Sequence, residues 1–151
     1  MKDINNSLTT NGSNPYNTVA LGSSAVFVAY EPLTGYELWI SNGSSGGTTL
    51  IKDIYVGGYG SSPSGLTNIG GVIYFSANDG VNGRELWKTD GTTAGTVLVK
   101  DINTGPASSG PVEFTLFSGL VYFRATTVAC SRSICFPQLR TFGNCCCSEI
   151  N

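Results

Sequence analysis

The fold of this chain is decided by the stretch Gly83-Arg84-Glu85-Leu86-Trp87-Lys88-Thr89-Asp90-Gly91-Thr92, because the sequence repeats it. One constant shift aligns residues 18–54 with residues 66–102 without a gap. The shift places Glu37-Leu38-Trp39 on Glu85-Leu86-Trp87. Self-similarity at one fixed period is typical of a repeat architecture. The chain is therefore expected to consist of successive copies of one structural unit.

The repeat separates a β-repeat domain, residues 1–125, from an atypical segment, residues 126–151. Within the domain we predict four pieces: an end strand at residues 2–4, a first unit at 18–54, a second unit at 66–102 and a partial third unit at 114–125. Residues 2–4, Lys-Asp-Ile, resemble the tail of an earlier unit, two residues out of register.

The repeat is not recognisable in residues 126–151. It predicts Glu-Leu-Trp at positions 133–135, but the chain has Ser133-Ile134-Cys135, and all five cysteines lie in this segment. A frameshift, a recombination junction and a genuine C-terminal cap are all consistent with this change. The chain has no histidine, and Cys145-Cys146-Cys147 lacks the spacing of zinc ligands. We expect free thiols, with disulfides as the alternative in an exported protein.

Each complete unit is expected to form four short antiparallel strands. Glycine-rich turns interrupt every segment, so we expect almost no helix. In the second unit the predicted strands are Gly65–Ile69, Val72–Asn78, Arg84–Thr89 and Thr96–Ile102. The fold class is therefore all-β, with tandem four-stranded units of about 48 residues that are β-propeller-like blades. A stacked or sandwich arrangement and a β-solenoid are the alternatives, although solenoid coils are usually shorter.

The composition argues against several classes of function. The net charge of -2 provides no basic patch for nucleic acid, and no apolar run is long enough for membrane insertion. The N-terminus has no apolar signal-peptide core, so we expect either a cytosolic protein or a leader outside this sequence. Without histidine, the commonest general base is absent, and Gly57-Gly58-Tyr59-Gly60 lacks the Lys-Ser/Thr of a phosphate loop. We expect no enzymatic activity.

The residues Glu85-Leu86-Trp87-Lys88-Thr89-Asp90-Gly91-Thr92 resemble the ELWxxDGT repeat of large bacterial surface or secreted proteins. The resemblance covers about residues 18–125. The first unit departs from it, with Asn42 and Ser44 in place of the Asp and Thr of Asp-Gly-Thr. The resemblance implies an extracellular or cell-surface setting and a propeller-like fold, and it implies no catalytic residues.

Two groups of residues are candidates for ligand binding. Trp39, Trp87, Glu37 and Glu85 recur beside polar turns and could bind glycans, with the indoles stacking on sugar rings. The structural alternative is that each tryptophan packs between neighbouring units. The loop oxygens of Asn78, Asp79 and Asn82 suit calcium, the one cofactor considered. A turn role is the alternative, because the matching loop of the first unit, residues 30–35, lacks most of these oxygens.

Three blades cannot close a ring, so we expect a homo-oligomer. Two chains could supply six blades, with each N-terminal strand completing the broken blade of its neighbour. The leading hypothesis for function is a non-enzymatic structural or adhesive module that self-assembles into an oligomer or fibre. The alternative is a carbohydrate-binding propeller of the lectin type.

Overall fold

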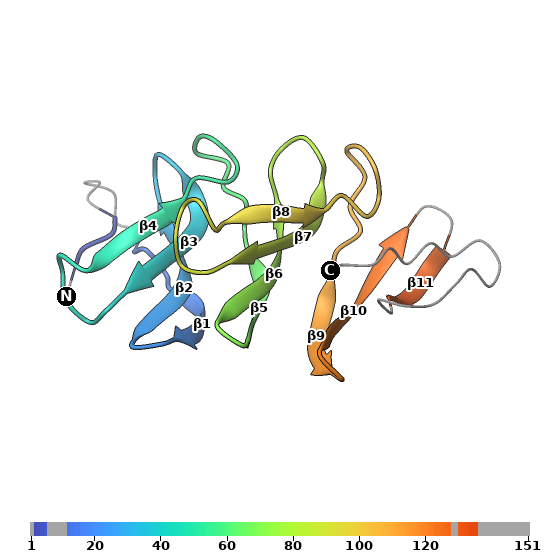
Figure 1. Ribbon diagram of the computed structural model, residues 1–151. Helices are drawn as coiled ribbons and strands as arrows, with labels where there is room; N and C mark the ends of the chain where they lie inside the picture. Colours follow the sequence, from blue (N-terminus) through green and yellow to red (C-terminus); the bar gives the residue numbers. More distant parts are fainter. Residues whose placement is uncertain (1, 6–11, 128–129, 136–151) are drawn as a thin grey trace.

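The computed structural model describes residues 2–5, 12–127 and 130–135, the last range as a backbone strand only. Its described residues form strands, turns and loops without a helix, so the predicted all-β class is confirmed. Three antiparallel sheets follow one another along the chain (Figure 1). Within the part of the chain that is described, no helix is long and apolar enough to span a membrane.

The first two sheets have the same four-stranded plan, in which each strand pairs with the next along the chain. The first contains β1 (Tyr16–Leu21), β2 (Ser24–Glu31), β3 (Gly35–Ser41) and β4 (Thr48–Lys52). The second contains β5 (Ser64–Ile69), β6 (Val72–Asn78), β7 (Arg84–Thr89) and β8 (Val97–Lys100). The third contains β9 (Val112–Phe117), β10 (Leu120–Thr127) and β11 (Cys130–Cys135).

Glycine sets the tight turns between these strands. Gly70 and Gly71 join β5 to β6 with φ angles of 63° and 88°, which other residues rarely adopt. Such a pair forms the two-residue turn that suits the twist of a hairpin. The glycine pair therefore forms the hairpin turn between two of the predicted strands. The register also repeats, since Phe27 lies opposite Trp39 in the first sheet and Phe75 lies opposite Trp87 in the second.

The predicted strand starts at Gly65 and Thr96 are each one residue from the observed starts, Ser64 and Val97, and two further differences are larger. β8 ends at Lys100, not at Ile102, because Ile102 donates its N–H to the Glu85 carboxylate instead of to a strand partner. The strand β11 continues the third sheet beyond residue 125, at the place where the repeat predicts its Glu-Leu-Trp strand. The backbone plan of the unit therefore extends into the segment where its sequence motif is lost.

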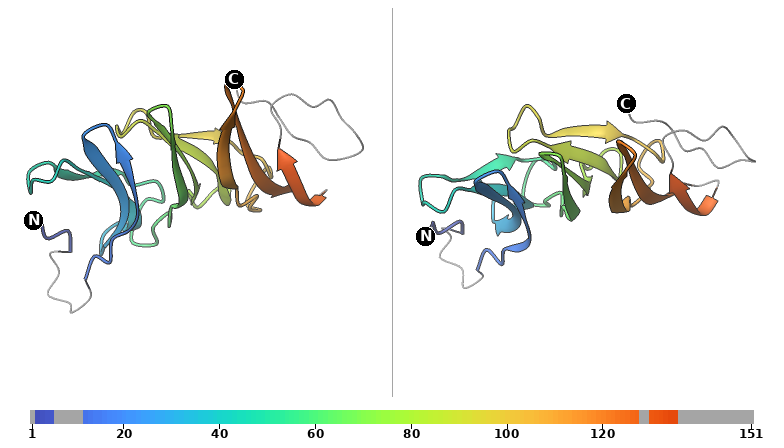
Figure 2. Two further views of the ribbon diagram at one scale, coloured as in Figure 1. Left: turned by 90° about the horizontal axis from the view of Figure 1, so that it is seen from below. Right: turned by 60° about the horizontal axis from the view of Figure 1, so that its bottom comes forward.

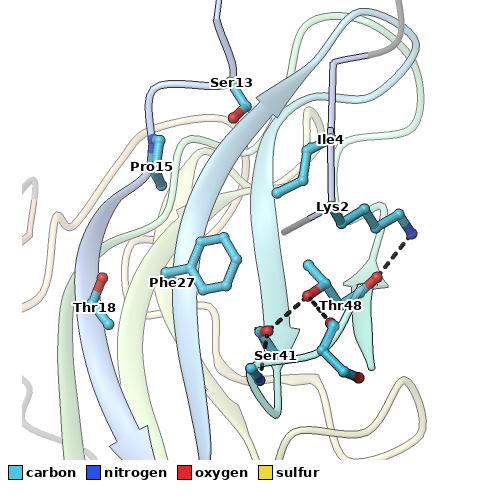
Figure 3. Close-up of a pocket in the computed structure, with 10 residues that line it drawn as sticks. Lys2, Ile4, Ser13, Pro15, Thr18, Phe27, Ser41 and Thr48 are labelled. Carbon is cyan, nitrogen blue, oxygen red and sulfur yellow. Dashed lines mark hydrogen bonds between the residues drawn. The ribbon is translucent and has the colours of Figure 1, made fainter. Parts of the chain in front are cut away.

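The end strand predicted at residues 2–4 is not a strand in the structure. These residues lie against the first sheet of their own chain, where Lys2 Nζ donates a hydrogen bond to the Thr48 carbonyl at 2.8 Å (Figure 3). Ile4 is buried against Ala29 and Trp39. The contact matches one made within the chain, since Lys52 Nζ donates to the Thr96 carbonyl at 2.8 Å. The segment therefore takes the place that the end of a preceding unit would have.

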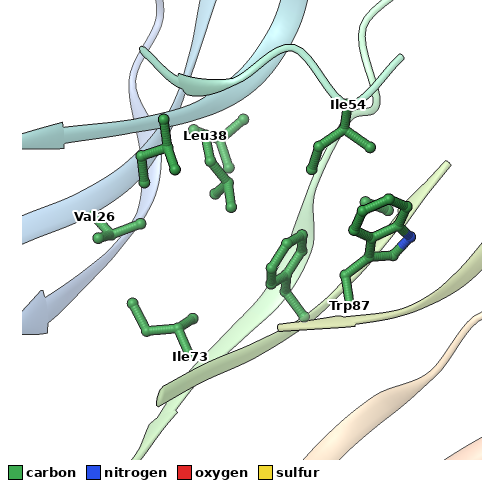
Figure 4. Packing of buried hydrophobic residues seen from close by; sticks show 9 residues of the cluster. Val26, Leu38, Ile54, Ile73 and Trp87 are labelled. Carbon is green, nitrogen blue, oxygen red and sulfur yellow. The ribbon is translucent and has the colours of Figure 1, made fainter. Parts of the chain in front are cut away.

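The sheets stack face against face, as two further views show (Figure 2). Between the first and second sheets, aliphatic side chains of the first sheet meet Phe75 and Trp87 of the second (Figure 4). Between the second and third, Leu86 packs with Phe114, Phe123 and Ala125. Each contact thus joins a mainly aliphatic face to a face that carries aromatic rings. The second sheet is covered on both faces, which explains why its strands are rich in apolar residues.

Candidate functional site

The repeated Glu-Leu-Trp motif occupies β3 and β7, and its glutamates are fully buried. The Glu37 carboxylate accepts hydrogen bonds from three donors of the loop that leads to the second sheet. Its Oε1 accepts the Ser61 N–H at 2.7 Å and the Tyr55 N–H at 3.1 Å, and its Oε2 accepts the Ser61 hydroxyl at 2.5 Å. The side chain therefore fixes the path of the loop between two sheets.

Glu85 repeats this arrangement at the equivalent position of the second unit. Its Oε1 accepts the Ser109 N–H at 2.7 Å, and its Oε2 accepts the Ser109 hydroxyl at 2.5 Å and the Ile102 N–H at 2.9 Å. We call each such set, Glu37 with Ser61 and Glu85 with Ser109, a linker clasp. Buried polar groups must find partners, and here the carboxylate and the loop satisfy one another.

The clasps place two carboxyl groups in surroundings that are poor in water. Burial raises the pKa of Glu37 and of Glu85 above the usual glutamate value, although the hydrogen bonds from Ser61 and Ser109 act in the opposite direction. A raised pKa in a general acid would be useful only if a substrate could reach it. Both side chains have an exposed fraction of 0%, so neither presents its carboxyl group to a ligand.

The two tryptophans are buried as well, each with an exposed fraction of 6%. Trp87 packs into the core between the first and second sheets, close to Ile54 (Figure 4). Trp39 packs beneath Ile4, and Lys2 Nζ lies 5.8 Å from the centre of its ring system. A sugar cannot stack on either indole in this arrangement. The position of Trp87 agrees with the structural alternative, in which each tryptophan packs between neighbouring units, whereas Trp39 packs against Ile4.

Leucine and tryptophan of the motif point in opposite directions, because adjacent residues of a strand lie on opposite faces. Leu38 joins the core that faces the second sheet, and Leu86 joins the core that faces the third. The tryptophans face backward along the chain. One Glu-Leu-Trp motif therefore makes a forward contact, a backward contact and a clasp on the loop that follows.

The Asp-Gly-Thr part of the repeat forms the turn that follows β7, and its counterpart in the first unit follows β3. Asp90 Oδ1 accepts the Thr92 N–H at 2.9 Å and the Thr92 hydroxyl at 2.7 Å. In the first unit, Asn42 Oδ1 accepts the Ser44 N–H at 3.1 Å and the Ser44 hydroxyl at 2.8 Å. The first unit departs from the repeat in sequence but keeps its hydrogen bonds, since an amide oxygen accepts as a carboxylate oxygen does.

The residues proposed for calcium, Asn78, Asp79 and Asn82, hold their own loop together. Asp79 Oδ1 accepts the N–H groups of Val81 and Asn82 at 2.9 and 2.7 Å, and its Oδ2 accepts from the Asn82 amide at 2.7 Å. Partial burial acts to raise the pKa of Asp79, but these hydrogen bonds outweigh it and lower the pKa. The oxygens thus take part in turn formation. Across the described ranges, no three His, Cys, Asp or Glu side chains gather as metal ligands would.

An open groove of about 510 Å³ lies on the free face of the first sheet (Figure 3). Its described lining is apolar at Ile4, Pro15 and Phe27 and carries hydroxyl groups at Ser41 and Thr48. Lys2 is the charged residue of this lining, and its ammonium group is bonded to Thr48. Among the described residues of the lining, apolar side chains and hydroxyl groups predominate and no carboxylate is present.

Sequence reasoning missed the serines of the linker clasps. Three Ser-x-Pro triplets keep the spacing of the repeat. They begin at Ser13, Ser61 and Ser109 and end at Pro15, Pro63 and Pro111. Each serine also accepts a backbone hydrogen bond from the following β2, β6 or β10 segment, at Tyr30, Asn78 and Thr126. The Ser-x-Pro pattern was therefore a visible signal. The cysteine side chains lie outside the described residues.

Comparisons with known proteins give no further identification. No protein-family model, no curated protein and no solved structure matches this chain.

Proposed function

We propose that this chain is a non-enzymatic structural module whose units stack to build an oligomer or fibre. The observation that carries the proposal is the role of the repeated residues. The glutamate, leucine and tryptophan of the motif are buried in both complete units and contact neighbouring sheets or the loop between them. Residues that hold neighbouring units together are what a structural repeat needs.

In this proposal the units are propeller-like blades. The first strands of successive sheets contact one another, β1 with β5 and β5 with β9, whereas the last strands β4 and β8 share no contact of that extent (Figure 1). A radial arrangement, with first strands around an axis and last strands at the rim, is how propeller blades are placed. The described sheets form an open arc, so a closed propeller requires additional blades from another source.

The proposed setting is extracellular or at a cell surface, where a structural or adhesive module of this kind would act. The support for this setting is the resemblance of Glu85-Leu86-Trp87-Lys88-Thr89-Asp90-Gly91-Thr92 to the ELWxxDGT repeat.

The first experiment separates this proposal from carbohydrate binding. Because Trp39 and Trp87 have an exposed fraction of only 6%, their fluorescence should be blue-shifted and weakly quenched by acrylamide. A panel of glycans should leave the emission unchanged. The urea-unfolded chain provides the control for full quenching. Saturable quenching by a glycan would contradict the proposal and support the lectin alternative.

Assembly is measured by light scattering on a size-exclusion column, over a range of protein concentrations and with a reductant present. The expected result is a mass that is a multiple of 15.8 kDa, or a distribution that grows with concentration. A monomer at every concentration would contradict the assembling part of the proposal.

A further inference from the structure

The free face of the first sheet is the same kind of surface as two faces that are covered within the chain. Phe27 corresponds to Phe75, which is fully buried by the first sheet. Gly43 corresponds to Gly91. A Cβ atom on Gly91 would lie 2.8 Å from Leu21 and 3.1 Å from Ile40, both in the first sheet, whereas a Cβ on Gly43 would meet nothing within 4 Å. The groove on this face therefore lies where the sheet of a preceding unit would pack.

Residues 2–4 of the same chain already make contacts that the end of a preceding unit would make. Lys2 bonds to Thr48 as Lys52 bonds to Thr96, at the same distance of 2.8 Å. Ile4 covers Trp39, and Ile54 lies in the core beside Trp87. Lys52 and Ile54 stand at the end of the last strand of their unit and just after it. Residues 2–4 thus take the place of the end of a preceding unit without forming a strand, and the groove lies where the strands of that unit would pack.

The described part of the third sheet carries the forward face that corresponds to this contact. In the described part of the chain it contains three strands, β9, β10 and β11, where the first and second sheets contain four. Among the described residues, its forward face is exposed at Phe117. Phe117 corresponds to Ile69, which packs between the second and third sheets, and to Leu21, which contacts Gly91. Phe117 itself has an exposed fraction of 67%.

We propose that the groove of the first sheet binds the third sheet of a second copy of this chain, head to tail. Phe117 of the second copy lies over Gly43, as Leu21 lies over Gly91, and residues 2–4 lie beside β11 of the second copy, where the end of a fourth strand would lie. The occupant is a second copy because its third sheet presents the face that this contact uses twice within one chain. A head-to-tail contact joins different surfaces and so forms rings or open fibres.

The charges on the two surfaces are compatible with this contact. On the third sheet, Arg124 and Glu113 form a 2.9 Å ion pair and so balance one another. In the groove, Lys2 is held by the Thr48 carbonyl. Asp3 is exposed and does not line the groove, so no described carboxylate of the lining enters the apolar centre of the contact, which would be costly.

The test uses two variants that block opposite ends. Thr18→Glu places a charge in the groove, and Phe117→Lys places one on the third sheet; both positions are exposed, so the fold should be retained and is verified by circular dichroism. Each variant alone should lose assembly and run as a 15.8 kDa monomer. Mixed in equal amounts, they retain one intact groove and one intact third sheet, and should form a dimer. An interface between identical surfaces would not give this result.

Two other exposed leucines provide controls, one on β9 and one in a turn of the first sheet. Leu116 is 54% exposed and precedes Phe117, so its side chain lies on the other face of β9. Leu116→Lys should therefore leave assembly unchanged, as should Leu33→Lys in the β2–β3 turn, which is 77% exposed.

The inference rests on the proposed function as an assembling module, and the outcomes separate the two. If the wild-type chain assembles and both blocking variants assemble equally well, the head-to-tail contact is wrong but the structural function stands. If the variants are monomers that do not combine when mixed, the contact is again wrong. If the wild-type chain is always a monomer, both proposals fall.

Discussion

Removing the carboxylate of a linker clasp should destabilise the fold far more than neutralising it. In Glu37→Ala, three donors lose their acceptor: the N–H groups of Tyr55 and Ser61 and the Ser61 hydroxyl. Ser61 is fully buried, so water does not readily replace the carboxylate. In Glu37→Gln, the amide oxygen can still accept the two N–H groups, and the amide N–H can donate to the Ser61 hydroxyl oxygen.

The size of the effect follows from these bonds. A hydrogen bond to a charged group contributes about 1.5–3 kcal/mol, so three independent bonds would total about 4.5–9 kcal/mol. They are not independent, because the loop can relax and the hydroxyl can rotate toward another acceptor. We expect Glu37→Ala to lower the free energy of unfolding by about 3–5 kcal/mol, the range for removing one partner of a buried charged pair. For Glu37→Gln we expect about 1 kcal/mol.

The assay is urea unfolding at pH 7, followed by circular dichroism, with the free energy obtained from the midpoint and slope. The matched control is Glu31→Ala. Glu31 also accepts three hydrogen bonds, but from Leu33 and Thr34 of its own partly exposed turn, so its loss should cost about 1 kcal/mol or less. If Glu37→Ala costs no more than Glu31→Ala, the clasp does not hold the sheets together and the reasoning is refuted.

Two other predictions concern pH and backbone conformation. Since burial raises the pKa of Glu37 and Glu85, their folded forms bind protons more tightly than the unfolded glutamates, whose pKa is about 4.5. As the pH rises from about 4.5 through the raised pKa values of the two glutamates, the free energy of unfolding of the wild type should therefore fall relative to that of E37Q/E85Q. The measurement is the urea midpoint of both proteins at each pH. A difference between the two midpoints that does not change with pH would contradict this. Gly35→Ala should cost about 3 kcal/mol, because φ is 70° and the new Cβ would lie 2.5 Å from the Gly60 nitrogen. Gly70→Ala has a similar φ of 63° but open space, so thermal unfolding should report a loss of only about 1–2 kcal/mol; equal losses would show that the close approach to Gly60 is unimportant.

The strands of the fold were predictable because their signals are local. Gly70-Gly71 marks a hairpin by its conformational freedom alone, and the β-branched and aromatic residues of β6 favour a strand wherever they occur. The constant period of the repeat then transfers each assignment to the next unit. The strand β11 lay beyond this reasoning, since at Ser133-Ile134-Cys135 the sequence pattern stops while the sheet continues.

The candidate site was less predictable. The repeat shows which positions recur, but it does not show which residues contact them in three dimensions. The repeat marks Glu37 and Trp39, but a repeated glutamate beside a repeated tryptophan suits a sugar site as well as a buried clasp. The distinction depends on Ser61, 24 residues away along the chain, and on whether another sheet covers the indole. The N-terminal prediction was limited in the same way. The likeness of residues 2–4 to Lys52-Asp53-Ile54 was visible, but the contact of Ile4 with Trp39 required the three-dimensional arrangement.

The linker clasps and the forward and backward contacts have a consequence for how the gene can change. Each described contact between sheets joins adjacent units, and the contacts recur with the same spacing. A duplication or deletion of one whole repeat would therefore keep a leucine facing an aromatic ring and a glutamate within reach of its serine. An insertion or deletion of one residue within a strand would instead shift the side chains of that strand relative to its neighbours. The protein can grow or shorten by recombination between its own repeats, and whole units are the steps in which it can do so without rebuilding its core.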